Sequence, residues 1–265
     1  MNYTLGFIGC GNMGGALIRA AAKKINGEQI AVCDFDTQKT QALKEQVNVH
    51  IETAQTIAQN CRFVVMGVKP QVMESALSEI AAILQKRNDV TIITMAAGLS
   101  ISAIRGYIGK DLPVIRIMPN TPVLVGAGMI LFATADVDTS AESEFLNCFE
   151  KAGLLDKIPE SEIDAGSALS GCGPAFMYAY ARALAQGATE CGVPQDKALT
   201  YAAQTMLGSA KMLLTYGDPD TLIKNVCSPG GTTIEGVKTL EKENLDGVAA
   251  DAVKASYKRT LELKK

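Results

Sequence analysis

Near the start of the chain, three glycines separate an apolar run from a helix-like run. Residues 3–8 are mostly apolar, Gly9-Cys10-Gly11-Asn12-Met13-Gly14 follows directly, and alanine and leucine dominate the next residues. A strand, a G-x-G-x-x-G turn and a helix in this order form the first unit of many dinucleotide-binding sheets. The alternative interpretation is a turn of small residues that binds no ligand.

Each glycine of this turn has its own expected role. Gly9 permits the turn, Gly11 lets the backbone approach a pyrophosphate, and Gly14 allows the helix to pack closely on the strand. A second expected strand, 29–33, ends at Asp34, about 20 residues beyond the last glycine, where an acidic residue accepts hydrogen bonds from the adenosine ribose. The same carboxylate repels a 2′-phosphate. The sequence therefore predicts a dinucleotide cofactor, with NADH favoured over NADPH.

Apolar runs continue to alternate with helix-like segments as far as residue 122. Strands are expected at 62–68, 90–95 and 114–118, and helices at 75–84 and, capped by Ser100, at 101–108. This alternation indicates an α/β fold with a parallel, doubly wound sheet of the Rossmann type. Ligands of such sheets bind at the carboxyl ends of the strands. Lys69-Pro70, Ala96-Ala97 and Asn120 each follow a strand, so we expect them on one rim with the glycine loop.

The second half of the chain has a helical character. Strand signals disappear after Ile158-Pro159, and alanine, leucine and methionine dominate from there. We expect a dinucleotide-binding domain over 1–160 and an all-α domain over 161–265. Its helices are expected at 175–190, 194–214, 219–226 and 245–263. So small a helical domain has a limited core of its own, which favours packing against a second subunit over a monomeric bundle.

A glycine-rich turn, Ser228-Pro-Gly-Gly-Thr-Thr-Ile-Glu235, stands out in this half. Thr232 and Glu235 have the spacing of a capping box, which predicts a helix start with Thr232 as its cap. Gly230 and Gly231 let the backbone turn tightly and leave its amides uncovered. Free N–H groups at the positive end of a helix form a seat for a carboxylate or a phosphate. The alternative is an ordinary glycine-rich loop with a good cap.

Composition excludes several classes of protein. Lysine and arginine number 25 against 28 acidic residues, and no basic cluster appears, so no nucleic-acid partner is expected. Seven scattered cysteines and a single histidine argue against a disulfide framework and a metal site. No apolar run reaches transmembrane length, and the first strand leaves no room for a leader peptide. We expect a soluble, cytoplasmic protein with no membrane partner.

Six sequence blocks resemble the pyrroline-5-carboxylate reductase family. They are Gly6-Phe-Ile-Gly-Cys-Gly-Asn-Met-Gly14, Val68-Lys-Pro70, Ile115-Arg-Ile-Met-Pro-Asn-Thr-Pro122, Ser170-Gly-Cys-Gly-Pro-Ala175, Gly208-Ser-Ala-Lys-Met-Leu213 and Val226-Cys-Ser-Pro-Gly-Gly-Thr-Thr-Ile-Glu235. These blocks are spread from end to end, so the resemblance covers essentially the whole chain. The block around Ser228 and the one around Gly208 discriminate better than the glycine fingerprint, which many dehydrogenases share.

The resemblance implies NAD(P)H-dependent reduction of 1-pyrroline-5-carboxylate to L-proline, the last step of proline biosynthesis. It implies a Rossmann domain, a helical dimerisation domain and active sites across a homodimer interface, in some members within a decamer made of dimers. Cofactor contacts are implied at Ile8, Gly9, Cys10, Gly11, Asn12, Met13, Gly14, Asp34, Val68, Lys69, Pro70, Ala96, Ala97 and Asn120. Substrate contacts are implied at Ser228, Gly230, Gly231, Thr232 and Thr233.

Within the implied substrate site, the amides of Gly231, Thr232 and Thr233 would hold the carboxylate. The Thr233 hydroxyl, the candidate catalytic group, would reach the ring nitrogen. Several positions depart from the family pattern, namely Cys172, Phe176, Ile223-Lys224 and Asp34. Only Asp34 bears on the cofactor, because small polar residues are frequent there in members that accept NADPH.

Two alternative functions remain open at the level of sequence. One is a hydroxyacid dehydrogenase of the 6-phosphogluconate type, which shares the layout but would need a lysine-centred acid–base motif on the long helix, where this chain has Gly208-Ser-Ala-Lys-Met. The other is a cofactor-sensing paralogue without turnover, which would not need the intact Ser228 turn. No acid is placed to protonate the imine, so we expect the substrate to arrive protonated, with relay by Thr233 or Ser170 as the alternative.

Overall fold

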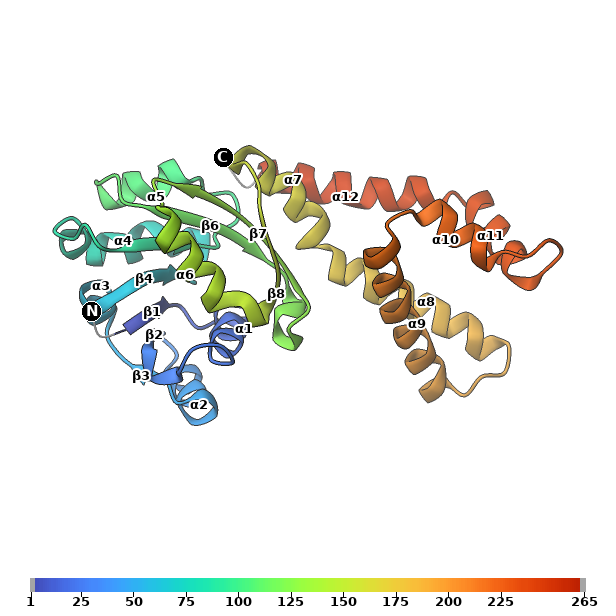
Figure 1. The fold of residues 1–265 in the computed structure, drawn as a ribbon, viewed down its shortest axis with the longest axis horizontal. Helices are drawn as coiled ribbons and strands as arrows, with labels where there is room; N and C mark the ends of the chain where they lie inside the picture. The colour runs from blue at the N-terminus through green and yellow to red at the C-terminus, as the bar shows by residue number, and fades with distance from the viewer. Residues whose placement is uncertain (1–2, 263–265) are drawn as a thin grey trace. The chain divides into compact units, whose positions relative to one another are not determined.

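The computed structural model describes residues 3–262, and the chain divides into two compact units (Figure 1). The first unit extends to Cys172 and includes a return segment that begins at Ser256, and the second unit is Gly173–Ala255. The first unit contains the sheet, and the second consists of helices.

The first unit is built on an eight-stranded sheet with the order β3-β2-β1-β4-β5-β6-β7-β8. Its strands are β1 (Tyr3–Ile8), β2 (Ile30–Cys33), β3 (His50–Ile51), β4 (Cys61–Met66), β5 (Thr91–Thr94), β6 (Val114–Pro119), β7 (Gly128–Ala135) and β8 (Gly153–Lys157). Every neighbouring pair is parallel except β6 and β7. The order reverses between β1 and β4, and this is the point where doubly wound sheets bind their ligands.

Helices cover both faces of this sheet (Figure 1). They are α1 (Asn12–Ala21), α2 (Thr37–Val47), α3 (Ala54–Asn60), α4 (Pro70–Leu84), α5 (Ile101–Ile108) and α6 (Thr139–Phe149). Along β4, Phe63 and Val65 belong to the core that includes α1 and α6, whereas Val64 and Met66 belong to the core with α3, α4 and α5. Side chains that alternate between two buried faces require an apolar strand throughout, which is why the sequence shows unbroken apolar runs.

The antiparallel strand β7 corrects the expectation of a wholly parallel sheet. The link from β6 to β7 is only residues 120–127, and it contains one short 3₁₀ helix, Thr121–Val125. A parallel connection needs a crossover of about a dozen residues or more, so this short link returns the chain beside β6 in the opposite direction. The strands β7 and β8 were not expected from the sequence, and β8 is largely exposed.

Helix α7 (Glu160–Ser170) packs on β7 and so lies within the first unit, although it follows the expected boundary near 160. A buried ion pair holds it to the sheet: an Nη atom of Arg116 on β6 lies 2.6 Å from an Oδ atom of Asp164. The same guanidinium lies 3.3 Å from Glu160 at the start of α7. The compact unit therefore ends after α7, at Cys172.

The second unit contains α8 (Gly173–Glu190), α9 (Gln195–Tyr216), α10 (Pro219–Val226), α11 (Thr232–Lys242) and the first part of α12 (Leu245–Glu262). The expected helices at 175–190, 194–214, 219–226 and 245–263 correspond to α8, α9, α10 and α12, and Leu263 lies outside the described residues. Among the helices described, none combines the length and the apolar character that a bilayer crossing requires.

Candidate active site

The glycine loop after β1 has the geometry that its sequence predicts. Gly9 adopts a φ of +100°, in the region that favours glycine. A Cβ on Gly14 would lie 2.4 Å from the carbonyl oxygen of Gly9, so only glycine lets α1 start this close to the strand. A Cβ on Gly11 would meet no atom within 4 Å, which leaves room for a ligand there. The first N–H groups of α1 have no partner within the helix and can bind a pyrophosphate.

A pocket of about 350 Å³ opens beside this loop in the first unit. It is lined by Gly11, Asn12, Met13, Gly14, Gly67, Val68, Lys69, Met95, Met118 and Pro119. The glycine loop and the Val68-Lys69 segment therefore line one pocket. Met95 and Met118, which also line this pocket, were not predicted as site residues, yet each ends a strand predicted to reach this rim.

Other expected rim residues stand next to the pocket without lining it. Pro70 begins α4, and Ala96 is buried, with its N–H 3.4 Å from the Thr94 hydroxyl. The side chain of Asn120 donates to the Ser170 carbonyl and accepts from the Met129 N–H, both at 2.9 Å. These two hydrogen bonds of its amide join the end of α7 to β7.

Asp34 is fixed at the end of β2 by the backbone around it. One carboxylate oxygen accepts the Cys10 N–H at 2.5 Å and the other accepts the Asp36 N–H at 2.9 Å. Each oxygen keeps a lone pair for a ribose hydroxyl. Lys39 Nζ lies 4.0 Å from Asp34 and 3.4 Å from Asp36. Two carboxylates therefore share one ammonium.

The thiol of Cys10 lies within the glycine loop and stays protonated at neutral pH. Burial, and then the negative charge of Asp34, raise the pKa of Cys10 to about 12. The thiol donates a weak hydrogen bond to the Cys33 carbonyl at 3.6 Å. Within residues 3–262, no cluster of His, Cys, Asp and Glu side chains is arranged to hold a metal ion.

The Ser228 segment of the second unit forms a tight turn before α11. The Gly231 N–H donates to the Ser228 carbonyl at 3.0 Å, and Gly230 has a φ of +70°. Proline followed by a glycine with positive φ is the signature of a type II turn. This hydrogen bond occupies the Gly231 amide, which was expected to hold a carboxylate. The N–H groups that point outward at the start of α11 are therefore those of Thr232, Thr233 and the next residue.

The capping box predicted at this turn is wrong, although α11 does begin at Thr232. Gly231 is the N-cap, in extended conformation, and within the described chain no side chain caps this helix. The turn places Gly231 where Thr232 was expected, so Thr232 is already helical. Glu235 pairs instead with Lys238 at 2.8 Å.

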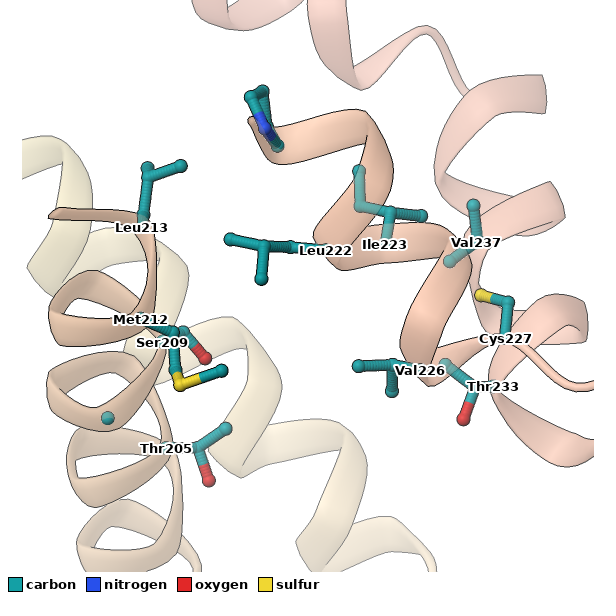
Figure 2. Close-up of a pocket in the computed structure, with 12 residues that line it drawn as sticks. Thr205, Ser209, Met212, Leu213, Leu222, Ile223, Val226, Cys227, Thr233 and Val237 are labelled. Carbon is teal, nitrogen blue, oxygen red and sulfur yellow. The ribbon is translucent and has the colours of Figure 1, made fainter. Parts of the chain in front are cut away.

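Thr233 borders a second hollow, an apolar groove of about 580 Å³ within the second unit. Figure 2 shows Leu222 and Val226 of α10 facing Met212 of α9 across this groove, with Thr233 beside Val226. The Thr233 side chain thus lies where the amides of α11 and an apolar surface meet. That combination suits a small molecule with a carboxylate at one end and an apolar ring at the other.

Comparison with known proteins identifies the family. A protein named pyrroline-5-carboxylate reductase from Escherichia coli (strain K12) is 37% identical over 270 residues, which cover 100% of both sequences. The chain belongs to the pyrroline-5-carboxylate reductase family. It is an oxidoreductase with an NAD(P)-binding Rossmann fold. The two family descriptions that match it are "Pyrroline-5-carboxylate reductase dimerisation" over residues 160–263 and "NADP oxidoreductase coenzyme F420-dependent" over residues 4–98.

Solved structures of this family have the same fold over the full length. A pyrroline-5-carboxylate reductase from Coxiella burnetii has a TM-score of 0.91 at 31% identity and covers 100% of both chains. The Plasmodium falciparum pyrroline carboxylate reductase, solved with NADP bound, has a TM-score of 0.88 at 28% identity and covers 100% of this chain and 99% of its own. The fold predicted from sequence is confirmed, except for the direction of β7.

Proposed function

We propose that this reductase converts 1-pyrroline-5-carboxylate to L-proline with NAD(P)H, in the cytoplasm. The observation that carries the proposal is the start of α11, where exposed amides and the Thr233 hydroxyl border an apolar groove, in a chain of this family. Two features of the first unit fit a dinucleotide: the open space at Gly11 and the doubly anchored carboxylate of Asp34.

The chain's own groups bind the cofactor and the substrate and orient them. The first amides of α1 hold the pyrophosphate, and the Val68-Lys69 segment borders the same pocket. When bound, NAD(P)H supplies a hydride from nicotinamide C4, which adds to the C=N carbon of the protonated imine and gives the secondary amine of proline. The amides of Thr232 and Thr233 hold the substrate carboxylate. The nitrogen enters already protonated, and the Thr233 hydroxyl accepts a hydrogen bond from this iminium N–H.

The proposed cofactor is NADH in preference to NADPH. Asp34 accepts the ribose hydroxyls, and a 2′-phosphate would instead meet the carboxylates of Asp34 and Asp36. Lys39 cannot offset both, because it already lies beside each of them. Loss of the ribose hydrogen bonds adds to this repulsion, for a total of ~1–3 kcal/mol on the scale of hydrogen bonds to charged groups.

The proposed assembly is a homodimer or a ring of dimers formed by the second unit. The buried residues of its helices are only Ala181, Ala198 and Ala202 among those described. Large apolar side chains such as Leu214 and Tyr216 on α9 are exposed at 83% and 65%. An apolar surface of this extent on a single chain marks a protein interface.

The experiment that tests the function is NADH oxidation, followed by its absorbance, with 1-pyrroline-5-carboxylate as substrate. Production of proline in equal amount supports the proposal. Hydroxyacids are tested with NAD⁺ in the reverse direction, and turnover of these compounds alone would instead indicate a hydroxyacid dehydrogenase. If cofactor binds but nothing is turned over, the chain is a sensor and the proposal fails.

A further inference from the structure

Phe35 follows Asp34 directly and is the most exposed of the large apolar residues between positions 3 and 262, with an exposed fraction of 105%. All seven phenylalanines lie within residues 3–262, and five of the others are buried to 2% or less: Phe7, Phe63, Phe132, Phe145 and Phe149. A single exposed apolar residue needs no special explanation. The position of Phe35 is what gives its exposure a meaning.

Both neighbours of Phe35 are held in the local structure. Asp34 turns back to the Cys10 and Asp36 amides, and Asp36 caps α2 by accepting the Gln38 N–H at 3.1 Å. The backbone on either side of Phe35 is therefore fixed, and its ring stands in solvent at the carboxyl end of β2. This loop borders the ligand crevice above β1, since β2 is the neighbour of β1 in the sheet.

The proposed ribose contact determines where the adenine lies. If both ribose hydroxyls bind Asp34, the base on the same sugar projects to the outer rim of the crevice, next to the residue that follows Asp34. An aromatic ring at that place offers a flat apolar face to a purine, and such stacking does not depend on hydrogen bonds.

We infer that Phe35 is the adenine platform of the cofactor site, where its ring stacks on the purine and positions the adenosine half of the dinucleotide. The inference rests on the proposed cofactor site. It names a binding residue for the adenine ring, and it predicts an effect confined to ligands that carry adenine.

The kinetic test compares two hydride donors. Phe35→Ala should raise KM for NADH about ten-fold with kcat little changed, because the aromatic ring that stacks on the adenine is lost. KM for reduced nicotinamide mononucleotide, which has no adenine, should stay the same. The melting temperature should also stay the same, because this side chain is fully exposed. Leu154→Ala on β8, which removes another exposed apolar side chain at the opposite edge of the sheet, is the matched control and should change neither KM.

A binding test avoids turnover altogether. The chain has seven tyrosines and no tryptophan, so Phe35→Trp introduces a single indole that can be excited at wavelengths where tyrosine does not absorb, with Leu154→Trp as the control. ADP-ribose should quench the Phe35→Trp emission with saturation, nicotinamide mononucleotide should not, and Leu154→Trp should respond to neither. If wild type binds ADP-ribose in a calorimeter but Phe35→Ala binds it equally well, the stacking role is wrong and the cofactor site stands. If the wild-type protein does not bind ADP-ribose at all, the stacking role and the proposed cofactor site are both wrong.

Discussion

Thr233 offers two groups to the substrate, a backbone amide and a hydroxyl, and a substitution separates them. Thr233→Ala removes the hydroxyl and keeps the amide, so carboxylate binding should survive. Loss of a hydrogen bond to a charged nitrogen costs ~1.5–3 kcal/mol, which lowers kcat/KM about ten- to 100-fold. The melting temperature should not change, because the side chain is exposed.

Thr232→Ala is the matched control for this measurement. Thr232 makes no capping hydrogen bond within the described chain, so its substitution should leave both stability and kcat/KM close to wild type. Full kcat/KM in Thr233→Ala would show that the hydroxyl has no role in the reaction.

Asp34 determines the proposed choice between NADH and NADPH. Asp34→Ser removes the charge that repels a 2′-phosphate and weakens the ribose contact. The ratio of kcat/KM for NADH to that for NADPH should fall about five- to 100-fold, from ~1–3 kcal/mol. Steady-state kinetics with both cofactors measures it. Asp156→Ser, an exposed position on β8, controls for the loss of one negative charge. A wild-type preference for NADPH contradicts the proposal directly.

At the scale of elements, the link between β6 and α7 depends on the Arg116–Asp164 pair. Both side chains are nearly fully buried, with exposed fractions of 3% and 4%. Asp164→Asn removes the buried charged partner of Arg116 and leaves only the more exposed Glu160 carboxylate at 3.3 Å. Breaking a buried ion pair costs ~3–5 kcal/mol, so we expect a loss toward the lower end of that range. Urea unfolding at fixed protein concentration measures the loss. Asp251→Asn, which breaks the exposed pair with Lys254, should cost at most ~1 kcal/mol. Equal losses would mean that the buried pair does not anchor α7.

Elements with strong local signals were predictable from sequence. The strand 3–8, the glycine loop and the helix capped by Ser100 match β1, the loop and α5, because each is determined by residues close together in the chain. The direction of β7 depends on how far the link from β6 can reach, which apolar patterning does not report. The length of that link would have indicated it, since Thr121–Val125 is too short for a crossover.

In the candidate site, too, local features were predictable and features that depend on the folded chain were not. The spacing of residues predicted the turn at the glycine loop, the position of Asp34 after β2 and the start of α11. It misjudged the cap and the Gly231 amide, because both depend on the turn type that Pro229 and Gly230 adopt together. The hydrogen bonds of Asn120 were not predictable for another reason: its partners, Ser170 and Met129, come from segments whose packing the sequence does not specify.

For the molecule as a whole, the exposed apolar surface of the second unit predicts self-association. Light scattering at micromolar concentration should give a mass of two chains of 28.0 kDa, or a multiple of two. Leu154→Glu, on the first unit, should not change this mass, whereas Leu214→Glu on α9 should lower it. A wild-type species of one chain at that concentration would contradict the proposed assembly.

The close contacts between the backbones of Gly9, Gly14 and Gly67 also limit which mutations of their codons the protein can tolerate. A Cβ on Gly14 or on Gly67 would lie 2.4 Å or 2.3 Å from the Gly9 carbonyl oxygen, and one on Gly9 would lie 2.6 Å from the Gly67 backbone. Every glycine codon begins with two guanines, and each one-base missense change in it adds a Cβ. We therefore expect every missense change of a single base in these three codons to damage the protein. The test is growth without proline of a proline auxotroph that depends on this gene and carries a library of single-base variants. The surviving clones should contain no missense change at Gly9, Gly14 or Gly67. Gly106, where a Cβ would meet nothing within 4 Å, should tolerate alanine.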